Sequence, residues 1–107
     1  MTVYWLSYRI EEDLTGDQRR KALVDEIAAQ ATPGLIWHET TSFIVFDSSN
    51  KIDGLAQAFR ATIDPRVDHF LIREMEAARA RICGRIRSNA IFQLMSRKGR
   101  TYLVRVP

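Results

Sequence analysis

The residues most suited to chemistry stand at the end of the first predicted strand, Val3–Ile10. Arg9 lies at its outgoing end, and the acidic run Glu11-Glu12-Asp13 follows at once. Hard cations such as magnesium prefer oxygen ligands, and acidic loops at strand ends often supply them. Consecutive side chains diverge, however, and a solvated loop before a helix N-terminus explains three acids equally well. Both interpretations stay open, and we assign no metal ligand.

The other reactive side chains are few and scattered. His38 and His69 each lie near a predicted strand, where a lone histidine is usually a hydrogen-bonded structural residue. Cys83 has Arg81 and Arg85 as near neighbours, which would lower its pKa if it were exposed, but a free cysteine is more often a small buried hydrophobe. The sequence contains no phosphate-binding glycine loop, nucleophile elbow or zinc spacing. We therefore expect no catalytic residue and no cofactor.

The positive charge is concentrated in the last third of the chain. Residues 1–71 carry 7 Lys and Arg against 11 Asp and Glu, whereas residues 72–107 carry 9 against 2. Such a segment attracts phosphate backbones, docks on an acidic protein, or is simply a solvated tail. The residues expected to bind nucleic acid are Arg9, Arg79, Arg81, Arg85, Arg87, Arg97, Lys98 and Arg100.

Length and composition indicate one domain with a real core. The chain has 107 residues, of which 46% are hydrophobic. We divide it into a domain over residues 1–75 and a basic C-terminal extension over residues 76–107. A single cysteine and the lack of a secretory or membrane-spanning apolar run favour a cytoplasmic protein without membrane contact.

The first strand must position Arg9, and its two faces differ. Tyr4, Leu6, Tyr8 and Ile10 alternate with Val3, Trp5, Ser7 and Arg9. The first set is the expected core face. The second set begins apolar and ends charged, which predicts a sheet face that is covered near the start of the strand and open near its end.

The following segments alternate between helical and extended patterns. Thr15, with Gln18 three residues later, predicts a capped helix that ends at Thr32-Pro33-Gly34. Two strands, 35–38 and 42–46, are expected to form a hairpin, and a second helix starts near Ile52. The run Phe70-Leu71-Ile72 indicates a buried strand.

This β-α-β-β-α-β order predicts an α+β fold of the ferredoxin-like type, an antiparallel sheet with two helices on one face. Beyond Met75 the pattern is less definite. Residues 76–86 fit a helical turn or a strand, residues 89–95 a short amphipathic helix, and residues 102–104 a last extended piece. A terminal extension of this kind can add to a neighbour's sheet edge.

Several short motifs resemble a known family. They are Tyr8-Arg9-Ile10 with its acidic loop, Arg19-Arg20-Lys21, the strand 42–46, and Ile63-Asp64-Pro65 with Asp68. Over about residues 3–75 the chain resembles the small CRISPR-associated dimeric protein of spacer acquisition and the related virulence-associated protein D. It also looks like small bacterial proteins labelled SinR-family.

The resemblance implies a ferredoxin-like protomer, a homodimer that pairs sheet faces through Trp5, Ser7 and Arg9, and C-terminal strand exchange. Nuclease members of the family carry a metal-binding aspartate at the position of Arg9. An arginine cannot ligate a cation, so the resemblance loses its catalytic residue here. Arg9 is instead expected to bind phosphate or to pair with Glu39 or Asp47 across the dimer.

Three hypotheses of function follow. The first is a non-catalytic homodimeric module that binds nucleic acid or an acidic protein through Arg9 and the segment from Arg79 to Arg105. The alternative is a small metal-dependent ribonuclease, of toxin-antitoxin or CRISPR-associated type, that would use carboxylates from Glu11-Glu12-Asp13. The third is a ferredoxin-like dimer that binds a small ligand, for which the sequence indicates no specific pocket residues.

Overall fold

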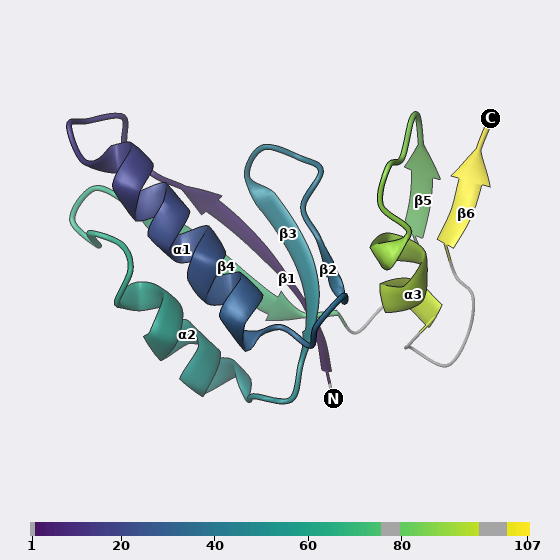
Figure 1. Cartoon of the computed structure of the whole chain (residues 1–107), viewed down its shortest axis with the longest axis horizontal. Coiled ribbons are helices and arrows are strands. Elements are labelled where there is room, and N and C mark those ends of the chain that lie inside the picture. Colours follow the sequence, from purple (N-terminus) through teal and green to yellow (C-terminus); the bar gives the residue numbers. More distant parts are fainter. Residues whose placement is uncertain (1, 76–79, 97–102) are drawn as a thin grey trace.

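The structure, a computed structural model, describes residues 2–75, 80–96 and 103–107 of the chain. It is an α+β protein, as the sequence predicts (Figure 1). In chain order the elements are β1 (Thr2–Arg9), α1 (Gly16–Gln30), β2 (Ile36–Trp37), β3 (Phe43–Ser48), α2 (Ile52–Arg60), β4 (His69–Glu74), β5 (Ala80–Cys83), α3 (Ala90–Ser96) and β6 (Leu103–Val106).

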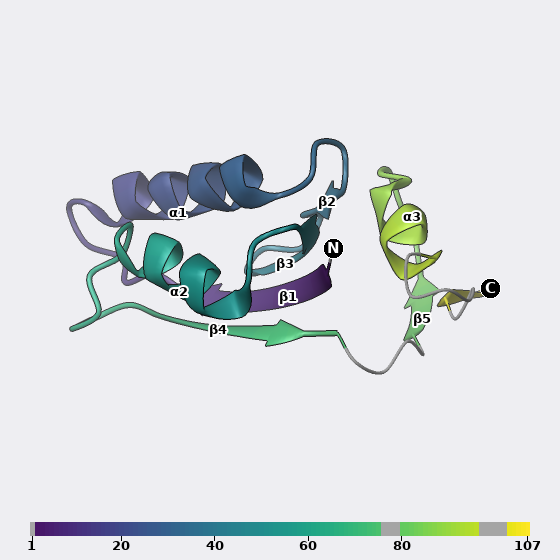
Figure 2. The ribbon, with the colours of Figure 1, turned by 90° about the horizontal axis from the view of Figure 1, so that it is seen from below.

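Four strands form one antiparallel sheet in the order β2-β3-β1-β4. β1 pairs with β3 along one side, where Ser7 lies opposite Phe43, and with β4 along the other, where Arg9 lies opposite His69. The helices α1 and α2 both cover the same face of this sheet (Figures 1 and 2). The other face is called the open face below.

The main core lies between the sheet and the two helices, as the alternation in β1 predicts. Tyr4, Leu6 and Tyr8 of β1 are buried against Leu23 and Ile27 of α1. Further members of this cluster are Ile10, Ala31, Ile44, Phe46, Leu55 and Phe59. Burial of this apolar surface, at about 25 cal/mol per Å², is the main force that fixes the helices on the sheet.

The C-terminal elements lie beside the end of the sheet where β1 begins (Figures 1 and 2). β5 and β6 pair in parallel as a separate two-stranded sheet. A second apolar cluster on the open face joins the sheet to α3: it contains Val3, Leu35, Trp37, Val45, Ile91, Leu94 and Met95. The open face is therefore covered at Val3 and exposed at Ser7 and Arg9, as expected from the sequence.

Glu39 fastens this C-terminal part to the β2–β3 hairpin. Its carboxylate accepts hydrogen bonds from the backbone amides of Arg87 (2.9 and 3.1 Å) and Ser88 (2.6 Å). The indole Nε1 of Trp37 donates a further bond of 3.0 Å. These donors, led by the backbone amides, hold the pKa of Glu39 below its ordinary value.

Three local predictions are wrong. Thr15 occupies the N-cap of α1 but makes no side-chain capping bond, because its hydroxyl accepts a hydrogen bond from Arg19 instead. Leu71 is 60% exposed rather than buried, since β4 is an edge strand covered on one face only. Cys83, expected to be buried, is exposed at the end of β5.

No helix in the described ranges is both long enough and apolar enough to cross a membrane.

Candidate nucleic-acid interface

The uncovered half of the open face forms a continuous surface over the three strands β1, β3 and β4. We call it the open sheet patch and define it as Trp5, Ser7, Arg9, Phe43, His69, Leu71 and Arg73. Strand register sets these side chains in rows, because residues opposite each other on paired strands point to the same side. Arg9 faces His69, Ser7 lies between Leu71 and Phe43, and Trp5 faces Arg73.

The exposed charge of the patch is of one sign. On the described strands of this face, the exposed ionisable side chains are Arg9, His69 and Arg73. The strands β1, β3 and β4 carry two acidic side chains. Asp47 is buried and accepts a hydrogen bond of 2.6 Å from the hydroxyl of Thr32, and Glu74 lies opposite Tyr4, on the helix-covered side of the sheet. A surface of this kind favours an anionic partner.

Trp5 and Phe43 place two aromatic rings side by side on the two central strands. Their ring centroids are 5.9 Å apart and the planes are inclined by 34°. Both residues are half-buried, because their inner edges pack against the second apolar cluster. Part of each ring thus remains accessible beside the arginines.

Arg9 stands at the exposed border of the patch. Its side chain is 67% exposed, and its Nη1 lies 3.6 Å from Oε2 of Glu11, which is also well exposed. An exposed pair of this length contributes little to stability and exchanges readily for another anion. The partners expected across a dimer are engaged elsewhere, since Asp47 is buried and Glu39 holds Arg87 and Ser88.

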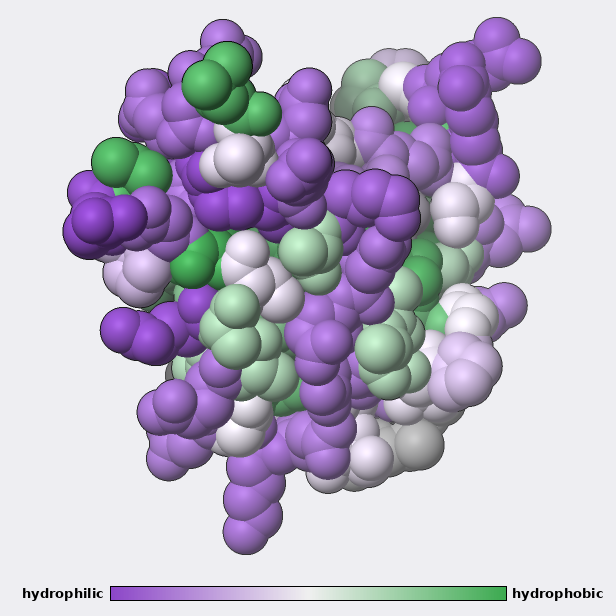
Figure 3. Space-filling model, turned by 60° about the vertical axis from the view of Figure 1, so that its left-hand side comes forward, coloured by the Kyte–Doolittle hydropathy of each residue, from purple (hydrophilic) through white to green (hydrophobic). Residues whose placement is uncertain are grey.

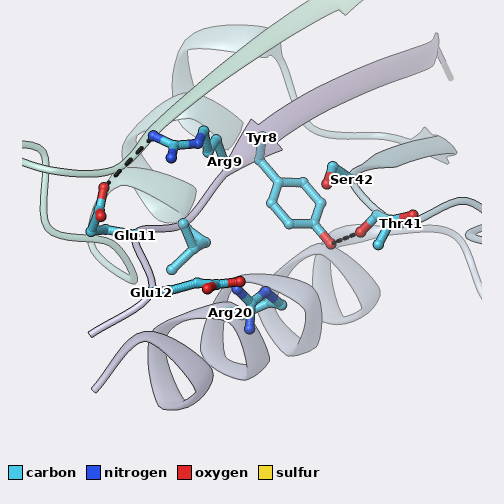
Figure 4. A pocket seen from close by; sticks show the side chains of 8 residues that line it. Tyr8, Arg9, Glu11, Glu12, Arg20, Thr41 and Ser42 are labelled. Atoms are coloured by element: carbon cyan, nitrogen blue, oxygen red, sulfur yellow. Dashed lines mark hydrogen bonds and ion pairs between the residues drawn. The ribbon is translucent and has the colours of Figure 1, made fainter. Parts of the chain in front are cut away.

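A cavity of about 550 Å³ adjoins the end of β1, lined by Tyr8, Arg9, Ile10, Glu11, Glu12, Arg20, Thr41 and Ser42 (Figure 4). The hydroxyl of Tyr8 donates to the carbonyl of Thr41 and also lies 3.2 Å from Nε2 of His38. Burial raises the pKa of Tyr8 and lowers that of His38. His38 is thus a hydrogen-bonded structural residue, as expected.

The acidic loop does not gather its carboxylates. Glu11 pairs with Arg9, and Glu12 extends towards Arg20 in Figure 4. Asp13 turns to Arg19, whose Nη1 and Nη2 lie 2.9 and 3.0 Å from its two oxygens. Among residues 2–75, 80–96 and 103–107, no three Asp, Glu, His or Cys side chains are grouped so that they could hold a metal ion.

Arg19 and Asp68 fix the loop that carries these residues. Asp68 is buried and accepts hydrogen bonds from Arg19 Nε (2.8 Å), the amide of Glu11 (2.9 Å) and the amide of Asp64 (2.9 Å). The Arg19 guanidinium is the main reason why the pKa of Asp68 falls to about 2. The end of β1 is therefore held rigidly against α1 and the segment before β4.

The surface around this loop is mostly hydrophilic. Figure 3 shows the end of the molecule that carries it, with a few hydrophobic side chains set apart among polar ones. The large exposed hydrophobic residues of the described chain are Leu14, Val67 and Leu71. The face seen in Figure 3 thus offers no broad apolar area for an obligate interface.

The basic residues expected to act with Arg9 do not surround it. Arg81, Arg85 and Arg87 belong to the C-terminal part, at the end of the sheet where β1 begins, whereas Arg9 lies at the other end (Figures 1 and 2). Arg85 and Arg87 line a separate polar cavity with His38 and Glu39. Arg79, Arg97, Lys98 and Arg100 lie outside the described residues.

Sequence reasoning placed Trp5, Ser7 and Arg9 on one face but missed Phe43, His69, Leu71 and Arg73. The signal for the last three was present: in β4 they alternate with Phe70 and Ile72, which pack on the main core. The interpretation of Phe70-Leu71-Ile72 as a wholly buried strand left that alternation unrecognised.

No protein-family model matches the chain. A comparison with curated proteins finds no significant match either.

Proposed function

We propose that the chain is a non-catalytic, ferredoxin-like module that binds nucleic acid through the open sheet patch. The observation that carries this proposal is an uncovered sheet face whose exposed ionisable side chains are Arg9, His69 and Arg73 and whose partly exposed rings are Trp5 and Phe43. Phosphate oxygens are the natural partners of such guanidiniums, and accessible rings offer contacts to bases.

The sheet order supports the ferredoxin-like assignment. β1 and β3 are the central strands, β2 and β4 the edges, and two helices cover one face. This arrangement leaves the opposite face of the central strands free for a ligand wherever the C-terminal elements do not cover it.

The homodimer predicted from the resemblance would use Trp5, Ser7 and Arg9 on this same face. In a two-fold dimer the patch would meet its own copy, so that Arg9 and Arg73 would approach two further arginines. Such like charges oppose close pairing, whereas a polyanion neutralises them. We therefore favour nucleic acid over a second copy or an acidic protein as the occupant of the patch.

The ribonuclease alternative receives no such support from the site. It needs carboxylates close together, but Glu11 pairs with Arg9, Asp13 pairs with Arg19, and Glu12 extends in another direction. The position at the end of β1 presents a guanidinium, which repels a metal ion.

Binding of a labelled RNA or DNA oligonucleotide, measured by fluorescence anisotropy over a series of salt concentrations, tests the proposal. In the double variant Arg9→Gln/Arg73→Gln we expect weaker binding. The slope of log K against log salt should shrink by roughly 1.4, since each phosphate contact contributes about 0.7 for single strands.

The matched control is Lys51→Gln/Arg60→Gln, which removes two exposed positive charges from the start and end of α2. It should leave the slope almost unchanged. Equal losses in the two double variants would mean that net charge alone drives binding, and the open sheet patch would not be the site.

A further inference from the structure

An apolar hollow lies directly beside the two rings of the open sheet patch. Its volume is about 400 Å³, and it lies between the open face and the C-terminal elements. The lining residues are Trp37, Thr40, Phe43, Val45, Met75, Arg81, Ile82, Ile91 and Met95. Phe43 belongs to both surfaces, so the hollow continues the ring pair without a break.

The chemistry of this surface suits a flat, apolar group that carries a negative charge nearby. The walls of the hollow are almost entirely hydrocarbon, aromatic and thioether, and Thr40 turns its hydroxyl to the carbonyl of Phe43 (3.0 Å). No described acidic side chain lines it, and Arg81 does. A nucleobase meets both requirements, because every base has a π-face and is joined to a phosphate.

Only an unpaired base can use such a surface. In a duplex the base faces are stacked inside the helix, and only the edges and phosphates can be reached. On the premise of the proposed function, we infer that the chain selects single-stranded nucleic acid, with a base stacked on Trp5 and Phe43 and a neighbouring base in the hollow. The protein contacts the faces of the bases by stacking and does not read their edges by hydrogen bonds. Single strands of different sequences should therefore bind.

The experiment compares a labelled twelve-residue oligo(dT), oligo(dA) and the duplex of the two at one salt concentration. Each single strand should bind at least about tenfold more tightly than the duplex, because a stacked base contributes about that factor or more. Phe43→Leu should lower single-strand affinity by about tenfold and leave duplex affinity unchanged. Phe70→Leu, which alters the same residue type on the helix-covered face, is the control and should change neither affinity.

A second measurement does not depend on the folding of a variant. Both tryptophans of the chain, Trp5 and Trp37, border this surface. Oligo(dT) should therefore quench the tryptophan emission of the unaltered protein, and the duplex should not.

Four results would overturn the inference. Salt-dependent binding with equal affinity for single strands and duplex would overturn the inference and leave the proposed function intact. Tryptophan emission that is not quenched in a saturated complex would have the same two consequences. A protein that binds no oligonucleotide at low salt would refute both claims. A dimer in solution that Leu71→Lys separates into monomers would show that a second copy occupies the patch.

Discussion

At the scale of single residues, Asp68 is the side chain on which the geometry around Arg9 depends. It is buried and accepts hydrogen bonds from α1, from the loop after β1 and from the segment before β4. We expect Asp68→Asn to lower the free energy of unfolding by on the order of 2–3 kcal/mol, because charge-assisted bonds are lost at a buried site. Urea denaturation measures this.

Asp17→Asn is the control for this change. Asp17 pairs with Arg20 at 2.7 Å, but its side chain is fully exposed, so its removal should have little effect. An equally stable Asp68→Asn protein would refute the structural role of Asp68.

The same carboxylate predicts how stability depends on pH. The pKa of Asp68 falls from an ordinary value of 3.8 to about 2 in the folded chain. Its contribution is therefore complete above about pH 4 and is lost as the pH falls towards 2, since the unfolded chain takes up the proton first. The pH dependence of the unfolding free energy in this window should flatten in Asp68→Asn. An identical pH dependence of the unfolding free energy in the parent protein and in Asp68→Asn would contradict this role of Asp68.

Two glycines should respond to alanine with opposite signs. A Cβ on Gly16 would collide with the carbonyl oxygen of Glu11, whereas one on Gly54 would meet nothing within 4 Å. Gly16→Ala should therefore destabilise the fold by about 1–3 kcal/mol. Gly54→Ala, in helix α2, should stabilise it by about 0.5–1 kcal/mol. Thermal melts of both variants measure these changes in stability. A Gly16→Ala protein as stable as the parent would contradict the close approach of position 16 to the carbonyl oxygen of Glu11.

At the scale of elements, Glu39 joins the β2–β3 hairpin to the segment before α3. We expect Glu39→Gln to speed amide hydrogen exchange over residues 80–96, because a neutral amide accepts these backbone bonds less strongly than a carboxylate. Exchange in α1 should not change. Asp53→Asn, in the exposed first turn of α2, serves as the control. Unaltered protection of the Ser88 amide would show that the apolar cluster alone holds the C-terminal part.

The sequence carried most of the information about the elements. Alternation in β1 predicted both of its faces, and Asn89–Met95 predicted α3. The strand β5 was left undecided, because an alanine- and arginine-rich segment suits helix and strand alike. The alternation of Leu71 with Phe70 and Ile72 was present in the sequence, but it did not show that the face of β4 carrying Leu71 is left uncovered.

The candidate site was harder to predict than the elements. Trp5, Ser7 and Arg9 share a face by their spacing alone, but Phe43 and Arg73 join them only through strand pairing between segments far apart in the sequence. The link between Asp68 and Arg19 likewise has no local pattern, because 49 positions separate the two residues.

At the scale of the whole molecule, the C-terminal elements divide the open face into a covered and an exposed half. The covered half buries Val3 and Trp37 under α3, and the exposed half presents the arginines of β1 and β4. The covered half thus stabilises the fold, and the exposed half is the part proposed to bind the ligand. Changes in the open sheet patch should therefore affect ligand affinity more than folding.

The most direct measurement of the central claim is a two-dimensional ¹H–¹⁵N NMR titration of the unaltered protein with oligo(dT) at low salt. We predict that the largest shifts fall on the amides of Trp5, Ser7, Arg9, Phe43 and Leu71 and on the indole signal of Trp5, while α1 and α2 hardly move. Shifts confined to the helix-covered side or to the C-terminal arginines, or a spectrum that does not change at all, would contradict binding at the open sheet patch.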